Sequence, residues 1–196
     1  MSLQLRCRCG KLQGEVETRR VAARAICYCK DCQAFARFLE PDGSLLDASG
    51  GTEVEATLPA GVRFTAGLEH LACMSLSPQG IYRWYAACCN TPVGNTPRNA
   101  AMPYVGLMRV CVAGTPDTLD RELGRARMTA NRGSAYGATV ATPVATVVGL
   151  AKIGGALVGS RLTGSWRDNP FFDSAGSLVR APRVLTREER AAVTRA

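Results

Sequence analysis

Short apolar stretches, separated by turn-forming residues, alternate along the first 117 residues of the chain. Their lengths are typical of β-strands, and the Pro and Gly residues between them favour tight turns. We expect strands at LQGEVE (12–17), GVRFTAG (61–67), GIYRWYAA (80–87) and YVGLMRVCV (104–112). The pattern therefore predicts a mainly β, antiparallel fold with little helix, the best early helix candidate being DCQAFARFLE (31–40).

The pattern changes after the first 114 residues and becomes typical of helices. We expect a helix over residues 115–128, because its opening Thr-Pro pair can supply a cap and the first helical residue. A further helix, LTREERAAV (185–193), begins with a T-x-x-E capping box. The chain is therefore predicted to consist of a β domain over residues 1–117 and a helical C-terminal extension over residues 118–196, packed on that domain.

A long apolar stretch, from Pro143 to Leu162, lies within this extension. A helix needs roughly 20 apolar residues to cross a bilayer, and this stretch has about that length. Lys152 stands in its middle and would cost roughly 2.5–3.5 kcal/mol on insertion. We therefore expect a packing or interfacial helix without integral membrane insertion, and membrane contact is the alternative. Such C-terminal helices could also join two copies of the chain into a homo-oligomer.

Nine cysteines and a single histidine are the most unusual features of the composition. The first ten residues, MSLQLRCRCG, carry charge where a secretory signal needs an apolar run, so we expect a cytoplasmic location. In that reducing compartment, a cysteine-rich chain is more often metal-binding or catalytic than joined by disulfides. His70 alone cannot build a histidine-rich metal site, and the G-x-S-x-G, P-loop and G-x-G-x-x-G motifs are missing. Metal binding or catalysis by the cysteine side chains is therefore the main candidate for the function.

The formal net charge of +8 is concentrated in the C-terminal part. Residues 1–117 hold 12 basic and 10 acidic side chains, whereas residues 118–196 hold 12 and 6. A four-thiolate zinc site carries −2 and a three-thiolate site −1, so one of each would reduce +8 to +5. The arginines are scattered and lack interleaved aromatic residues, so we expect no nucleic-acid binding.

Seven of the nine cysteines form a pattern typical of metal ligands. They are the C-x-C pair Cys7 and Cys9, the C-x-C-x-x-C triplet Cys27, Cys29 and Cys32, and the dipeptide Cys88–Cys89. Residues i and i+2 of an extended chain point to the same face, so each C-x-C can direct two sulfurs to one point. The turn after the triplet's second cysteine can bring its third to the same place. The other two cysteines, Cys73 and Cys111, are expected to be ordinary buried side chains.

The order of these motifs resembles that of the glutathione-dependent formaldehyde-activating enzyme family, which includes centromere-protein-V-like members. The resemblance covers residues from about 6 to 112, and the C-terminal part lies outside it. The last motif departs from the family pattern: aligning CNTP (89–92) with the family's C-G-T-P places Ala86 where another cysteine is expected.

The resemblance implies a β-tent-like arrangement of small antiparallel sheets around two zinc ions. Cys7, Cys9 and Cys89 match ligands of a structural zinc, and Ala86 leaves that site one thiolate short. Cys88 can supply the missing thiolate if the chain turns there. The triplet Cys27, Cys29 and Cys32 matches the ligands of a catalytic zinc, with an exchangeable fourth position near bound glutathione.

This resemblance favours a zinc-dependent carbon–sulfur lyase, acting on S-hydroxymethylglutathione-like or related thiol adducts, with a small thiol such as glutathione as its partner. With no histidine in the motifs, a proton shuttle would need an acid, a tyrosine or water; Tyr28 and Asp31 lie inside the triplet motif. Two alternatives stay open. One is a non-catalytic zinc module whose basic C-terminal part binds a partner, and the other is a thiol-based redox or metal sensor.

Overall fold

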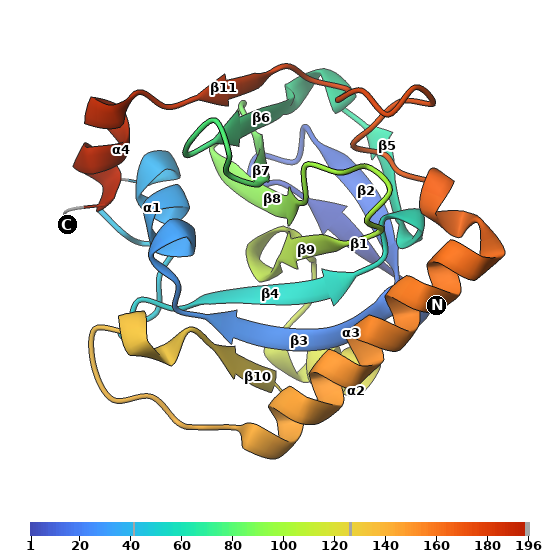
Figure 1. Cartoon of the computed structure of the whole chain (residues 1–196), viewed down its shortest axis with the longest axis horizontal. Coiled ribbons are helices and arrows are strands. Elements are labelled where there is room, and N and C mark those ends of the chain that lie inside the picture. The colour runs from blue at the N-terminus through green and yellow to red at the C-terminus, as the bar shows by residue number, and fades with distance from the viewer. Residues whose placement is uncertain (41, 126, 195–196) are drawn as a thin grey trace.

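A computed structural model of the chain describes residues 1–40, 42–125 and 127–194 (Figure 1). Within these residues there are eleven strands in two sheets and four α-helices. The small sheet has the order β1 (Ser2–Arg6), β2 (Gln13–Glu17), β5 (Val62–Ala66). The large sheet has the order β10 (Arg127–Ala130), β3 (Val21–Cys27), β4 (Thr52–Thr57), β9 (Val105–Met108), β8 (Thr91–Thr96), β7 (Tyr82–Ala86), β6 (Leu71–Ser75), β11 (Pro182–Val184). The helices are α1 (Lys30–Leu39), α2 (Pro116–Leu123), α3 (Pro143–Thr163) and α4 (Arg187–Thr194). The predicted sheet-rich fold with a C-terminal helix is confirmed.

The strand expected over residues 104–112 is shorter in the structure. β9 ends at Met108, and a 3₁₀ turn over Arg109–Cys111 follows it. The turn takes the chain out of the large sheet, so that Val112 can bridge to Leu5 in the small sheet. The segment thus connects the two sheets, and an uninterrupted strand would keep it within one of them.

The segment after residue 117 contributes strands as well as helices. The helix expected over residues 115–128 ends at Leu123, because Gly124 adopts a φ of 82° that stops it. β10 then pairs with β3, and β11 pairs with β6, both in parallel. These two short strands form the two edges of the large sheet, and the prediction of helices alone for this segment missed them.

The core has two parts, one on each face of the large sheet. The larger part lies between the two sheets and contains Trp84, Leu107 and Phe171, each of them fully buried. The smaller part lies beneath α1 and contains Phe35 and Met74. Cys73 and Cys111 are buried in the larger part, 3% and 2% exposed, which confirms the prediction that they are ordinary core residues.

A buried ionic group joins β3 and β4 to α2. Arg24, only 1% exposed, donates to Asp120 Oδ1 at 2.6 Å and to Glu53 Oε1 at 2.9 Å. Glu55, also 1% exposed, lies 3.4 Å from Arg24 Nε, yet its carboxylate accepts no hydrogen bond from the described residues. A buried carboxylate without hydrogen bonds is costly to ionise, so Glu55 is a weak point of the fold at high pH.

Candidate metal centres

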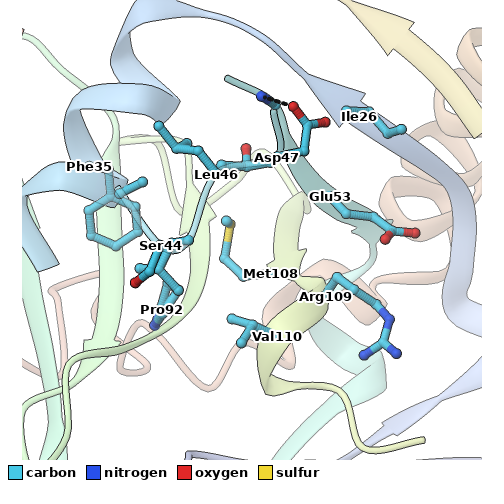
Figure 2. Close-up of a pocket in the computed structure, with 14 residues that line it drawn as sticks. Ile26, Phe35, Ser44, Leu46, Asp47, Glu53, Pro92, Met108, Arg109 and Val110 are labelled. Atoms are coloured by element: carbon cyan, nitrogen blue, oxygen red, sulfur yellow. Dashed lines mark hydrogen bonds between the residues drawn. The ribbon is translucent and has the colours of Figure 1, made fainter. Parts of the chain in front are cut away.

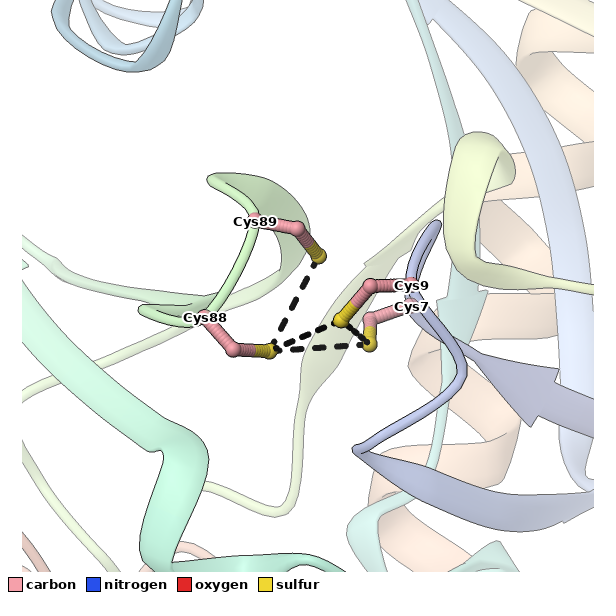
Figure 3. A group of neighbouring side chains, drawn as sticks. All are labelled: Cys7, Cys9, Cys88 and Cys89. Atoms are coloured by element: carbon pink, nitrogen blue, oxygen red, sulfur yellow. Dashed lines mark hydrogen bonds between the residues drawn. The ribbon is translucent and has the colours of Figure 1, made fainter.

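Four sulfurs converge where the turn after β1 meets the turn after β7 (Figure 3). They belong to Cys7, Cys9, Cys88 and Cys89. Cys7 Sγ lies 3.6 Å from Cys9 Sγ and 3.8 Å from Cys88 Sγ, and Cys88 Sγ lies 3.3 Å from Cys9 Sγ and 3.8 Å from Cys89 Sγ. A tetrahedral ion with metal–sulfur bonds of about 2.3 Å would place its sulfurs about 3.8 Å apart. The spacing therefore fits a four-thiolate metal site.

The turn after β7 explains how two adjacent cysteines can share one site. The residues from Ala87 to Asn90 are in turn conformation, and Asn90 has a φ of 52°. Cys88 and Cys89 are therefore free of the strand alternation that would send their side chains to opposite faces. Ala86 ends β7 and is completely buried in the core. Ala86 has no sulfur to offer this group, and the structure brings the sulfur of Cys88 to it instead.

Contacts around this group connect the two sheets to α1. The Arg8 side chain donates to the Cys89 carbonyl at 3.1 Å and pairs with Glu40 beyond the end of α1. The Arg8 backbone N–H donates to Thr91 Oγ1 at 2.9 Å. Burial disfavours ionisation of Cys89, but hydrogen bonds from the Thr91 hydroxyl and from the Cys9 backbone outweigh it and bring the pKa of Cys89 down to about 6. One thiol of the group is thus ready to ionise near neutral pH.

The second sulfur group lies where β3 ends and α1 begins. The sulfurs of Cys27, Cys29 and Cys32 are within 4.8 Å of one another, and no fourth ligand of the described chain belongs to the group. Cys29 is the N-cap of α1, and its sulfur accepts a hydrogen bond from the Cys32 backbone N–H at 3.3 Å. The N-terminus of a helix favours negative charge, so the location suits thiolates.

Two hydrogen-bond donors from distant parts of the chain reach this three-sulfur group. Asn131 follows β10 in a left-handed conformation (φ 56°), and its Nδ2 donates to Cys27 Sγ at 3.5 Å. Arg83, in β7, places Nη1 4.0 Å from Cys32 Sγ. Sequence reasoning missed Asn131, because 104 residues separate it from Cys27 and no motif connects them. For Arg83 the signal is the resemblance to the formaldehyde-activating family, which aligns it with a position that is often basic.

Arg83 is a buried cation, and few groups near it other than the sulfurs compensate its charge. Its side chain is 2% exposed, Nη1 donates to Asn95 Oδ1 at 3.1 Å, and the guanidinium lies 5.3 Å from the centre of the Phe35 ring. Asp31, half exposed, is 4.0 Å away, and Nε finds no hydrogen-bond partner among the described residues. A buried charge needs an opposite charge nearby, and an ionised Cys32 group would provide one.

Ionisation within the three-sulfur group is uneven. Hydrogen bonds from the thiols of Cys29 and Cys32 hold the pKa of Cys27 far below its ordinary value, whereas the same contact with Cys27 raises the pKa of Cys29. Burial, together with the charges of Cys27 and Cys32, raises the pKa of Tyr104 to about 12. One thiolate thus forms readily and the next only at high cost, unless a cation enters the group.

The two motif residues considered for proton transfer occupy different surroundings. Tyr28 is buried, 6% exposed, and burial raises its pKa. Its ring fills the space beside Gly51, where an added Cβ would overlap it. Asp31 lies at the surface, 3.8 Å from Arg190 of α4. These contacts give Tyr28 a packing role and Asp31 an ion-pairing role.

A cavity of about 430 Å³ is lined by residues of α1, of the segment before β4, and of β4, β8 and β9, and none of the three cysteines is among them (Figure 2). Its wall includes Phe35, one turn of α1 beyond Cys32, and Thr52, which pairs with Cys27 in the sheet. The lining is mostly apolar, and the charged groups at its rim are already paired: Arg109, for example, donates to the carbonyls of the chain that follows it. The cavity therefore suits an apolar group.

With two groups of cysteine sulfurs on a sheet-rich fold, the chain is a candidate metal-binding protein. Residues 1–178 match a family of unknown function (DUF6151), and the chain belongs to that family. No curated protein matches it. A similar solved structure is that of a Rhodobacter sphaeroides protein, with 17% identity, coverage of 64% of this chain and 98% of that chain, and a TM-score of 0.45. At that score the likeness carries no argument.

Proposed function

We propose that the chain is a zinc enzyme of the carbon–sulfur lyase type, acting on adducts of aldehydes with small thiols such as glutathione. The observation that carries the proposal is the three-sulfur group at the start of α1, which has no fourth ligand from the described residues. Zinc sites with four protein ligands are usually structural, whereas three ligands leave a position for a substrate. The resemblance of the cysteine motifs to the formaldehyde-activating family supplies the substrate class.

The donor sets support zinc as the metal at both groups. Sulfur ligands in tetrahedral spacing favour zinc or iron–sulfur chemistry over hard cations such as magnesium. Cys7, Cys9, Cys88 and Cys89 would form the closed site, which joins the turns of the two sheets and stabilises the fold. All nine cysteines, each within the described part of the chain, are free thiols. The proposal therefore requires a reducing compartment such as the cytoplasm.

The residues around the three-sulfur group suit the reversible addition of a thiol to an aldehyde. Zinc bound there would keep a substrate thiol deprotonated. In the addition reaction, the thiolate sulfur bonds to the carbonyl carbon, the C=O π electrons move to the oxygen, and that oxygen takes up a proton. When the adduct breaks down, each of these changes is reversed. We take water as the proton donor, since no carboxylate of the described residues joins the three-sulfur group. Arg83 would balance the negative charge.

We propose that the organic part of the adduct extends into the cavity whose wall includes Phe35, one turn of α1 beyond Cys32. Its apolar wall, which includes Phe35, Leu46 and Met108, would favour adducts in which the thiol or the aldehyde carries an apolar portion. An aldehyde larger than formaldehyde is therefore a substrate to test beside it.

The experiment combines metal content, ligand binding and turnover. Protein purified reduced and without chelator should contain two zinc ions per chain. After cobalt substitution, glutathione should change the visible spectrum, and exchange NMR should show faster formation and breakdown of the glutathione–formaldehyde adduct than in buffer.

Two variants complete the test. Cys29→Ser should lose the spectral response and the activity while staying folded, and Cys73→Ala, which removes a buried thiol outside both groups, should keep them. A cobalt spectrum that no small thiol alters would end the enzyme proposal, and a non-catalytic zinc module would replace it.

A further inference from the structure

The outer face of α3 is apolar and exposed along nearly the whole helix. By length and composition this helix could cross a membrane, and little of it is buried in the fold. Its inner side rests on β3 and β10, where an added Cβ on Gly149 would overlap Met128. The six large exposed side chains are those of Val144, Val147, Val148, Leu150, Val158 and Leu162, between 47% and 83% exposed. We define the outer face of α3 as these six together with Ala151 and Gly155.

The charges of α3 lie to either side of the centre of this outer face. α3 contains no acidic residue, and at 100° per residue its two basic residues, Lys152 and Arg161, lie on opposite sides of the helix, with Leu150 alone of the face beyond Arg161. The exposed strip between them is formed by small and β-branched residues together with Leu162. A soluble monomer rarely exposes so continuous an apolar surface, so the outer face needs an occupant.

We propose that the outer face of α3 binds the same face of a second copy of this chain, with the two helices antiparallel. A two-fold axis near residue 153 would place Ala151 opposite the partner's Gly155, and Val148 opposite the partner's Val158. Small residues thus meet at the centre, where helix backbones can approach closely, and larger residues meet on either side. This is the self-complementary pattern that a two-fold interface requires.

The size of the face agrees with a dimer of modest affinity. At roughly 100 Å² for each of the six large side chains, one copy offers about 600 Å² and a pair about 1,200 Å², the lower end of specific interfaces. A hollow of about 410 Å³ between Met102 and the C-terminal half of α3 continues the surface. Interfaces at this lower end of the size range belong to weak or transient complexes, so we set the expected dissociation constant on the order of micromolar.

The composition of the face favours a second copy over a lipid surface. Helices that lie in a bilayer interface use large aromatic and leucine side chains. Here the centre of the face is Ala151 and Gly155, and the nearby Trp166 ring lies between the guanidiniums of Arg161 and Arg167, 4.7 and 4.6 Å from their carbons. In the antiparallel pair the two Lys152 side chains fall on the same border, so added salt should strengthen the dimer, whereas it weakens binding to anionic lipid.

The test uses the full chain, reduced and zinc-loaded, in sedimentation equilibrium. Gly155→Arg places a large cation at the centre of the face, where nothing lies within 4 Å of an added Cβ, so the monomer should fold as before. It should weaken dimerisation by at least about tenfold, because two buried charges would meet. Gly137→Arg, at another open glycine outside the face, should leave the dimer unchanged.

Three outcomes would overturn the proposal. The first is a wild-type chain that stays monomeric well above micromolar concentration. The second is a Gly155→Arg chain that dimerises like the wild type. The third is a monomer that binds vesicles of phosphatidylcholine and phosphatidylserine, and binds them no less after Gly155→Arg, which would assign the face to a membrane. The dimer does not depend on the metal chemistry, so either proposal can fail alone.

Discussion

Glu55 provides a test of the folded state that can be worked through in numbers. Its carboxylate is buried in β4, and burial, opposed by the charge of Arg24, raises its pKa from an ordinary 4.5 to about 7. Each pKa unit corresponds to about 1.36 kcal/mol, so the ionised carboxylate costs the fold about 3 kcal/mol. Replacing Glu55 by Gln removes the ionisation and keeps the shape, while Arg24 keeps its contacts with Glu53 and Asp120.

The sign of the effect follows from proton binding. Between pH 4.5 and about 7 the folded chain holds a proton on Glu55 that the unfolded chain has lost, so stability falls as the pH rises through this range. Above pH 7 the penalty is complete. Between pH 6 and pH 8 the wild type should therefore lose about 1 kcal/mol relative to Glu55→Gln.

Urea unfolding of both proteins at several pH values, with constant zinc and reductant, measures this difference. Comparing the two proteins at each pH cancels the contribution of the cysteine groups, which are the same in both. A difference that stays flat from pH 6 to pH 8, or a wild type that gains stability relative to the variant, would show that Glu55 is not a buried, costly carboxylate.

Three further predictions concern the sulfur groups. Cys88→Ser should lower the zinc content from two to one per chain and destabilise the fold by a large part of the roughly 10 kcal/mol that a structural zinc supplies. Elemental analysis and thermal melting measure the two effects, and a variant that retains two zinc ions would exclude Cys88 as a ligand. Arg83→Met should weaken metal binding at the three-sulfur group by about 10- to 100-fold in chelator competition, with Arg83→Lys in between, and equal affinities in all three proteins would contradict charge compensation. Asn131→Ala should shift the cobalt spectrum of the same group while changing stability by about 1 kcal/mol, and an unchanged spectrum would separate Asn131 from the site.

The sequence was most informative where a motif is local. The C-x-C-x-x-C spacing predicted the convergence of Cys27, Cys29 and Cys32, because a strand end followed by a helix start leaves the chain little choice. The Cys88–Cys89 dipeptide was harder, since its geometry depends on whether the chain is a strand or a turn at that point. The left-handed Asn90 decides it.

Contacts between residues that are far apart in the sequence could not be predicted from local patterns. β10 and β11 have only four and three residues, too few to show alternation, and their partners lie about 100 residues away in the chain. Asn131 reaches Cys27 only because β10 pairs with β3. The proposed boundary after residue 117 was therefore based on the change in the sequence pattern alone. The large sheet contains strands from both sides of that boundary.

The placement of β10 and β11 has a consequence for synthesis on the ribosome. All four cysteines of the first group lie before residue 90, so that group can assemble while the later half of the chain is still being made. The Cys27 group receives Asn131 only after β10 has emerged, and β6 gains its outer neighbour only when residues 182–184 arrive. The outer edges of β3 and β6 are thus both uncovered until residues 127–130 emerge, and a chain cut short before β11 would be released with the β6 edge exposed.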